Sequence, residues 1–127
     1  NVNTYVASYR ENGKVYTFDV KGFHDGNDMY LSLNDMYNMI VILDKRAKVY
    51  IHVDNHTMVY EMYDGKYYFD YGHHKIICPY GVYYFNRNNK HIYVSDKNIY
   101  IPVCYIEKIL LQDTRRINIE NANVIIE

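Results

Sequence analysis

A set of alternate polar residues forms the most metal-like pattern in the chain: His52, Asp54 and His56. On a continuous strand, residues two apart project from the same face, and imidazole nitrogens together with a carboxylate oxygen suit Zn²⁺ or Cu²⁺. However, Asp54-Asn55 is a typical turn pair, and no further strong ligand is predictable beside it. We therefore predict exposed polar residues around a turn, and we assign no metal or other cofactor.

The remaining reactive side chains form no recognisable catalytic set. His73 and His74 are adjacent, and adjacent residues on a strand point to opposite faces, so a solvated loop is the better interpretation. Cys78 precedes Pro79 in an apolar segment, which is typical of an inert thiol. The sequence contains no glycine-rich phosphate loop, no Gly-x-Ser-x-Gly and no His-Glu-x-x-His. We therefore predict that the protein is not an enzyme.

Cys78 and Cys104 are the only two cysteines. A disulfide between them is an option in a secreted protein, but the bond needs Cα atoms within about 7 Å of each other. Both residues also have apolar neighbours in the sequence, which fits two buried free thiols. Both interpretations stay open at this point.

Composition and charge limit the classes of partner. The chain has 127 residues, which fits a single domain over residues 1–127. Its 14 basic residues nearly balance its 15 acidic ones, so no electrostatic feature favours nucleic acid or an anionic membrane as partner. No segment approaches the ~20 apolar residues that a membrane-spanning helix needs, and we expect no membrane insertion.

Turn residues divide most of the chain into short strand-like segments. Asn12-Gly13 lies between two such segments and predicts a hairpin with a type I′ turn. Similar turn pairs follow at Asp54-Asn55, Asp64-Gly65, Asn88-Asn89 and Asn121-Ala122. Two other segments, 33–41 and 103–111, carry apolar residues at helical spacing. Ser32 is placed to cap the first helix, and Pro102 favours an extended backbone just before the second.

The order of hairpin, short extended step, helix and strand occurs twice along the chain. Residues 9–16 match residues 86–93 with one residue of slip, and residues 29–33 match residues 99–103. Matching segments in the same order indicate an internal repeat. The first copy spans residues 4–53 and the second spans residues 75–127, each with approximate ends.

Two segments carry a family likeness: Gly-Lys-Val-Tyr-Thr-Phe-Asp-Val at residues 13–20 and Tyr-Ile-Pro-Val at residues 100–103. With the hairpin before and the short helix after, they resemble the copper amine oxidase N-terminal domain, also called the stalk domain, in two repeats. Ser32 departs from the proline that is usual in the first copy. Asn34 and Cys104 stand where an arginine often follows.

The resemblance implies a strand-dominated α+β fold, in which an antiparallel meander sheet is packed by two short helices. It also implies a non-catalytic, secreted or cell-surface module of a bacterial protein, which acts as a spacer or contacts protein or cell wall. No Asn-Tyr-Asp or Asn-Tyr-Glu cofactor motif occurs, so the family name does not predict a copper enzyme. The strands that the resemblance implies lie near residues 48–53, 57–63, 66–71, 75–85 and 90–95.

Tyrosine is the most unusual component, with 17 Tyr against 4 Phe and no Trp. Tyr fits the half-buried surface of a strand and keeps a hydroxyl at the water boundary. Strand alternation leaves one sheet face apolar for the helices. The opposite face then holds Tyr50, Tyr63, Tyr68 and Tyr93 among polar residues. That face is covered by the terminal hairpins, contacts a protein, or binds carbohydrate or peptidoglycan through its rings, although the lack of Trp weakens the last alternative.

Overall fold

The computed structural model of the chain describes residues 1–43, 48–52, 57–62, 64–85, 91–95 and 98–127. The first part holds β1 (Asn3–Glu11), β2 (Lys14–Asp25), β3 (Asp28–Ser32) and α1 (Leu33–Leu43). The middle part holds β4 (Lys48–His52), β5 (Thr57–Met62), β6 (Gly65–Asp70), β7 (Lys75–Cys78) and β8 (Gly81–Tyr84). The last part holds β9 (Tyr93–Ser95), β10 (Asn98–Pro102), α2 (Val103–Tyr105), the π-helix η2 (Ile106–Leu110), β11 (Ile117–Glu120) and β12 (Asn123–Ile126).

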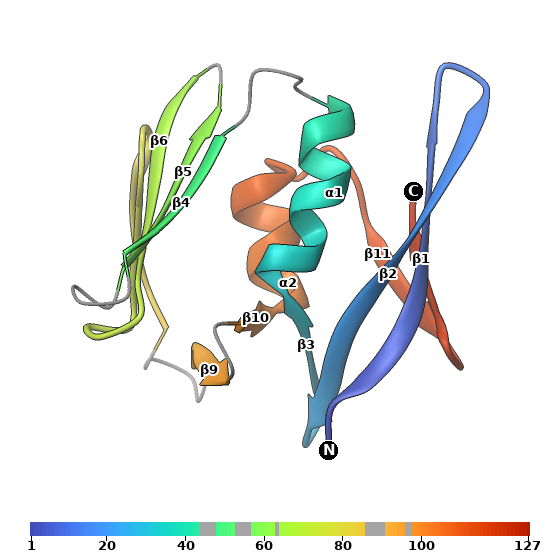
Figure 1. Cartoon of the computed structure of the whole chain (residues 1–127), viewed down its shortest axis with the longest axis horizontal. Coiled ribbons are helices and arrows are strands. Elements are labelled where there is room, and N and C mark those ends of the chain that lie inside the picture. Colours follow the sequence, from blue (N-terminus) through green and yellow to red (C-terminus); the bar gives the residue numbers. More distant parts are fainter. Residues whose placement is uncertain (44–47, 53–56, 63, 86–90, 96–97) are drawn as a thin grey trace.

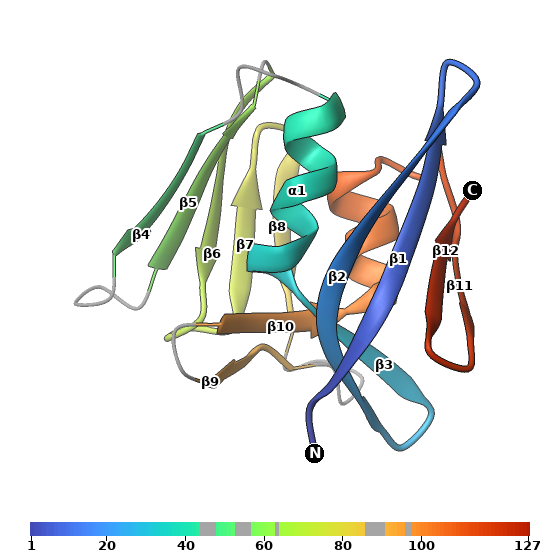
Figure 2. The same ribbon diagram turned by 45° about the vertical axis from the view of Figure 1, so that its right-hand side comes forward.

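Two sheets lie on opposite sides of the helices, so the molecule has three layers (Figure 1). One sheet has seven strands in the order β11-β12-β1-β2-β3-β10-β9, and the other has five strands in the order β4-β5-β6-β7-β8. The five-stranded sheet is a strict antiparallel meander (Figure 2). The strand-dominated α+β class with two short helical segments is therefore confirmed, although the strands form two sheets where the sequence predicts one.

Strand β9 belongs to the seven-stranded sheet and not to the predicted meander. The sequence predicts that residues 90–95 continue the meander, but β9 pairs with β10 in the seven-stranded sheet. The hairpin predicted at Asn88-Asn89 is therefore wrong, because the strands on either side of it belong to different sheets; residues 86–90 lie outside the described part of the chain. Residues 75–85 are also not one strand. They divide into β7 and β8 at Pro79-Tyr80, where proline has no N–H to donate to a ladder.

The hairpins at both chain ends follow the predicted turn chemistry. Asn12 and Gly13 both have positive φ, at 51° and 77°, as a type I′ turn requires, and β1 pairs with β2 over its whole length. Asn121 also has positive φ, at 54°, between the antiparallel strands β11 and β12. Strand β12 then lies parallel to β1, a pairing that no local sequence pattern predicts.

The matched segments 29–33 and 99–103 meet inside the seven-stranded sheet, where β3 lies next to β10. Strands β3 and β10 are antiparallel, and Leu31 lies directly opposite Ile101, which is its own equivalent in the repeat. Each of these strands continues directly into a helix, so the two strand–helix units are related by an approximate two-fold axis at this residue pair. The segments after the helices differ, because β4 enters the five-stranded sheet and β11 the seven-stranded one.

The helix starts agree with the sequence. The Ser32 hydroxyl accepts a hydrogen bond from the Asp35 N–H at 3.2 Å, which caps α1. Pro102 has an extended backbone (φ −61°, ψ 141°) just before α2. The second helix then widens into η2, where the Leu111 N–H donates to the Ile106 carbonyl at 3.0 Å. Within the described ranges, no helix is both long and apolar enough to cross a bilayer.

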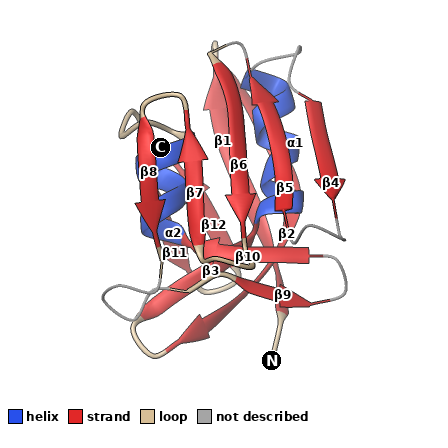
Figure 3. Ribbon diagram, turned by 90° about the vertical axis from the view of Figure 1, so that its left-hand side faces the viewer, coloured by secondary structure: helices blue, strands red, loops and turns tan. Residues whose placement is uncertain are grey.

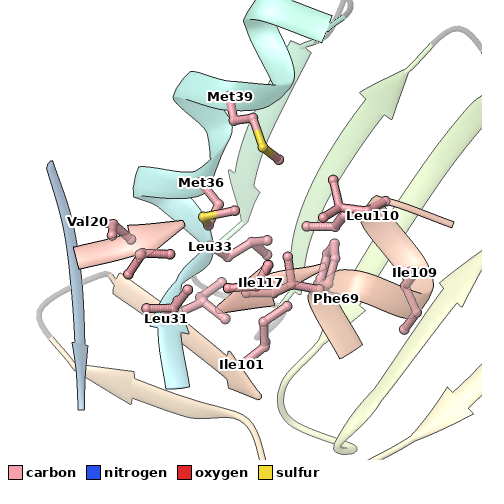
Figure 4. Packing of buried hydrophobic residues seen from close by; sticks show 14 of the residues in the cluster. Val20, Leu31, Leu33, Met36, Met39, Phe69, Ile101, Ile109, Leu110 and Ile117 are labelled. Carbon is pink, nitrogen blue, oxygen red and sulfur yellow. The ribbon is translucent and has the colours of Figure 1, made fainter. Parts of the chain in front are cut away.

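The core lies between the layers and takes side chains from both sheets and both helical segments (Figure 4). Leu31 of β3, Met36 of α1 and Phe69 of β6 are each fully buried. Ile109 of η2 is also fully buried, so the second helical segment contributes to the same core. Burial of such side chains contributes about 1.5–3 kcal/mol each relative to full exposure. The helices therefore hold the two sheets together and leave the outer sheet faces uncovered by them.

Candidate binding surfaces

The predicted metal-like residues lie outside the part of the structure that can be described. This holds for the side chain of His52 and for the whole of Asp54 and His56. Among the described residues, no three His, Cys, Asp or Glu side chains gather as a metal site would need. Cys78 is buried, Cys104 is exposed, and they form no disulfide with each other. The disulfide interpretation is therefore wrong, and the two thiols differ in accessibility.

The four predicted tyrosines do not come together on one face. The side chains of Tyr50 and Tyr63 lie outside the described residues. Tyr68 lies on the outer face of the five-stranded sheet and is 37% exposed. Tyr93 instead belongs to β9 of the other sheet, where β9 pairs with β10. A continuous surface through Tyr68 and Tyr93 is therefore excluded.

Tyr93 has a packing role in an aromatic cluster. Its ring contacts Phe23 and Tyr30 edge-on, with centroids 5.4 and 5.0 Å away, and Phe23 stacks on Tyr30 at 5.1 Å. Its hydroxyl donates to Asp25 Oδ2 at 2.7 Å. This hydrogen bond, with some burial, raises the pKa of Tyr93 to about 12. The cluster ties β9 to β2 and β3, so Tyr93 joins strands rather than presenting a free ring.

An apolar row crosses the outer face of the five-stranded sheet. Val59, Tyr68, Ile77 and Val82 occupy successive opposite positions on β5, β6, β7 and β8. Ile77 is 37% exposed and Val82 is 48% exposed. Tyr84, 45% exposed, extends the apolar surface on β8. Figure 3 shows these strands in front of the helices with no described element over them. We call Val59, Tyr68, Ile77, Val82 and Tyr84 the outer apolar row.

Charged residues of both signs lie on either side of this row. Glu61 and Lys66 are directly opposite each other on β5 and β6, and Asp70 and Lys75 are opposite each other on β6 and β7. Each flank is therefore close to neutral. The covering of this face by the terminal hairpins, one of three alternatives from the sequence, is wrong because β1, β2, β11 and β12 all belong to the other sheet.

A second candidate site lies where three turns meet. The β5–β6 turn at Asp64-Gly65 touches the β7–β8 turn, since a Cβ added to Gly65 would lie 2.9 Å from Pro79 Cγ. The turn after η2 joins them through Gln112. Gln112 and Asp113 both have positive φ, at 50° and 56°. Two consecutive non-glycine residues with positive φ cost free energy, and such backbone strain often occurs at binding sites.

A buried tyrosine and a carboxylate hold the three turns together. The Tyr67 hydroxyl donates to Asp64 Oδ2 at 2.7 Å. The Gln112 amide donates to the same oxygen at 3.1 Å and to the Tyr67 hydroxyl at 3.3 Å. Burial, followed by the hydrogen bond to Asp64, raises the pKa of Tyr67 well above its usual value. Asp64 Oδ1 is also buried and accepts no hydrogen bond from a described residue, so this carboxylate is only half satisfied.

Tyr80 joins this cluster to the π-helix. Its hydroxyl donates to the Ile109 carbonyl at 2.5 Å, a group that the i→i+5 pattern of a π-helix can leave available. Partial burial raises the pKa of Tyr80 to about 12. Beside it lies a cavity of about 260 Å³, lined by Tyr80, Tyr83, Lys108, Gln112 and Asp113. None of these residues belongs to a site predicted from the sequence; Pro79-Tyr80-Gly81 is the turn signal that could have indicated this corner.

Alkaline pH is expected to destabilise the fold through these tyrosines. An unfolded tyrosine ionises near pH 10, whereas the folded pKa is about 12 for Tyr80 and Tyr93 and is also raised for Tyr67. Their contribution to stability is complete below pH 10 and is lost as the pH rises through about 12. The free energy of unfolding, measured by denaturant titration between these pH values, should therefore fall. Tyr67→Phe should make that fall shallower; an unchanged slope in this variant would contradict the assignment.

Comparisons with known protein families, curated proteins and solved structures gave no match for this chain. The resemblance to the copper amine oxidase N-terminal domain therefore stays a prediction that rests on residues 13–20 and 100–103. Two surfaces of the chain are candidates for binding: the outer apolar row and the site where the three turns meet.

Proposed function

We propose that the protein is a non-catalytic interaction module that contacts a second copy of itself through the outer apolar row. The observation that carries this proposal is the exposure of Ile77, Val82 and Tyr84, each 37–48% exposed, on one sheet face. A contiguous apolar surface of this kind is typical of interaction sites on soluble proteins. The non-catalytic part of the proposal is supported by the sequence, which lacks the common nucleophile and metalloprotease motifs.

The composition of the row favours a protein over a sugar as its partner. Val59, Ile77 and Val82 are aliphatic, and their exposed surface is best removed from water by apolar side chains of another protein. A sugar stacks on aromatic faces, and Tyr68 and Tyr84 are the only described rings in the row. Sheets also pack well face to face, at a separation of about 10 Å.

Charge and area favour a second copy that binds weakly. Because Glu61 pairs with Lys66 and Asp70 with Lys75 across the strands, two copies of this face meet without net repulsion between like charges. Five strands about 4.8 Å apart and about five residues long give a face of roughly 400 Å². Two such faces bury about 800 Å², below the 1,200–2,000 Å² of stable complexes. We therefore expect a weak and reversible contact.

Sedimentation equilibrium over a wide range of protein concentration tests the proposal. The wild-type chain should show a reversible monomer–dimer equilibrium. Val82→Lys should weaken it about tenfold or more, because each copy then brings a buried, like-charged lysine into the contact between the two rows. Val15→Lys is the matched control: Val15 is a valine of similar exposure, 55% against 48%, on β2 of the other sheet. It should leave the equilibrium unchanged.

Three outcomes would contradict the proposal. A chain that stays monomeric at all concentrations excludes self-association. Equal weakening by Val82→Lys and Val15→Lys places the contact elsewhere. Amide shift changes on dilution that map to β1, β2, β11 or β12, and not to β5–β8, assign the contact to the seven-stranded sheet. A secreted or cell-surface location, which the family resemblance implies, is part of the proposal and is tested by locating the protein in fractionated cells.

A further inference from the structure

The cavity beside η2 is separate from the outer apolar row and has different walls. It opens between the β7–β8 turn and the C-terminal end of η2, with a volume of about 260 Å³. Two tyrosines, one lysine, one amide and one carboxylate line it: Tyr80, Tyr83, Lys108, Gln112 and Asp113. Aromatic and polar groups that converge on a small hollow are typical of a ligand site.

Two tyrosine rings form walls at nearly a right angle. The centroids of Tyr80 and Tyr83 are 6.4 Å apart, and their planes differ by 72°. Tyr80 is fixed on its other side by the Tyr67 ring, at 6.3 Å and 76°, and by its hydrogen bond to the Ile109 carbonyl. Because these contacts hold the Tyr80 ring before any ligand arrives, little rotamer freedom is lost on binding.

The polar groups of the cavity offer both donors and acceptors. The Gln112 amide nitrogen donates to Asp64 and Tyr67, which fixes the amide orientation and leaves Oε1 without a described donor. The Lys108 ammonium lies 5.0 Å from the Tyr83 ring centroid, and it forms no ion pair with a described residue. Asp113 Oδ1 lies 3.5 Å from Arg116 Nη1 in an exposed pair.

The mixture of charges selects a neutral ligand. The lining carries one charge of each sign, on Lys108 and Asp113, so it offers no net charge to an anion or a cation; Arg116, which contacts Asp113, does not line the cavity. A neutral ring with several hydroxyl groups can bind to both Lys108 and Asp113, because each hydroxyl donates one hydrogen bond and accepts others. Its C–H faces can lie against the two tyrosine rings. The volume is below the 300–1,000 Å³ typical of sites for drug-sized ligands, so one ring fits and a longer saccharide would have to extend into solvent.

We propose that this cavity binds a single neutral sugar ring, with Tyr80 and Tyr83 as stacking walls and with Lys108 and the Gln112 Oε1 as hydrogen-bonding partners of the hydroxyl groups. A ligand of about 12 heavy atoms in an open site binds with a dissociation constant on the order of 1 mM. This site is independent of the self-association proposed above, and either can fail while the other holds.

Titrations followed by protein NMR test the site. The probes are the methyl glycosides of glucose, galactose, mannose and N-acetylglucosamine, with inorganic phosphate and tetramethylammonium as charged alternatives. At least one glycoside should cause saturable shifts of the Tyr80 and Tyr83 ring protons and of the Gln112 side-chain amide. Lys108→Met keeps most of an exposed side chain but loses the ammonium, and should weaken binding about fivefold or more. Lys14→Met, a change of an exposed lysine in the β1–β2 hairpin, should not.

The proposal is overturned if none of the four glycosides binds, or if phosphate or tetramethylammonium binds at this cavity and the glycosides do not. It is also overturned if Lys108→Met and Lys14→Met bind alike. Thermal unfolding of each variant separates loss of binding from loss of fold. A Lys108→Met chain that keeps the wild-type transition but loses the glycoside shifts supports a direct contact.

Discussion

Replacing Leu31 with alanine is expected to lower the free energy of unfolding by about 3 kcal/mol. Leu31 of β3 is fully buried and lies opposite Ile101 of β10 and Gly22 of β2. The side chain therefore lies where the two halves of the repeat and the first hairpin meet, and the surrounding strands cannot close around the cavity without changing their register. Denaturant unfolding should show a lower midpoint with an unchanged slope.

A double-mutant cycle tests the approximate two-fold arrangement. Side chains directly opposite each other on antiparallel strands are in contact, so Leu31→Ala and Ile101→Ala should not add independently. We expect a coupling free energy of about 0.5–3 kcal/mol between the two changes. Ile77→Ala, on the exposed outer face, is the control and should cost much less than either. Additive effects of Leu31→Ala and Ile101→Ala within about 0.3 kcal/mol would mean that the two residues do not touch.

Local structure follows from the sequence wherever one short pattern decides it. Asn12-Gly13 predicts its hairpin because both residues tolerate positive φ, and Ser32 predicts the start of α1 because its hydroxyl caps the first turn. Asn88-Asn89 carries a similar signal, yet β8 and β9 separate into different sheets. A turn pair indicates that the chain can reverse its direction there. It does not indicate whether the two flanking strands pair with each other or with other strands.

Which residues share a binding surface also depends on the pairing of strands that are far apart in the sequence. Alternation correctly places Tyr68 on the face opposite the helices, because period two is a property of one strand. It fails for Tyr93, because that residue shares a surface with Tyr68 only if β9 joins the meander. The site at the three turns is harder still: Asp64, Tyr80 and Gln112 come from segments with no shared period, and only the packing of η2 against the five-stranded sheet brings them together.

Gly22→Ala is expected to destabilise the fold by at least about 2 kcal/mol, because overpacking at this point meets backbone. A Cβ at Gly22 would lie 2.6 Å from the Tyr30 carbonyl oxygen and 2.8 Å from Leu31 Cδ2. The leucine side chain can rotate away, but the carbonyl belongs to β3, which pairs with β2 through Gly22. The added methyl group must therefore separate β2 from β3 at the centre of the seven-stranded sheet.

Two further variants isolate this cause. Lys21→Ala changes the exposed neighbour of Gly22 on β2, so it should alter the free energy of unfolding by no more than about 0.5 kcal/mol. Leu31→Ala removes the side-chain clash at Gly22 but leaves the Tyr30 carbonyl in place, so the Gly22→Ala/Leu31→Ala chain should remain less stable than Leu31→Ala alone. If Gly22→Ala instead matches the wild type, or if Leu31→Ala rescues it fully, then β2 does not approach the β3 backbone this closely. The position of β3 between β2 and β10, on which the approximate two-fold axis depends, would then be wrong as well.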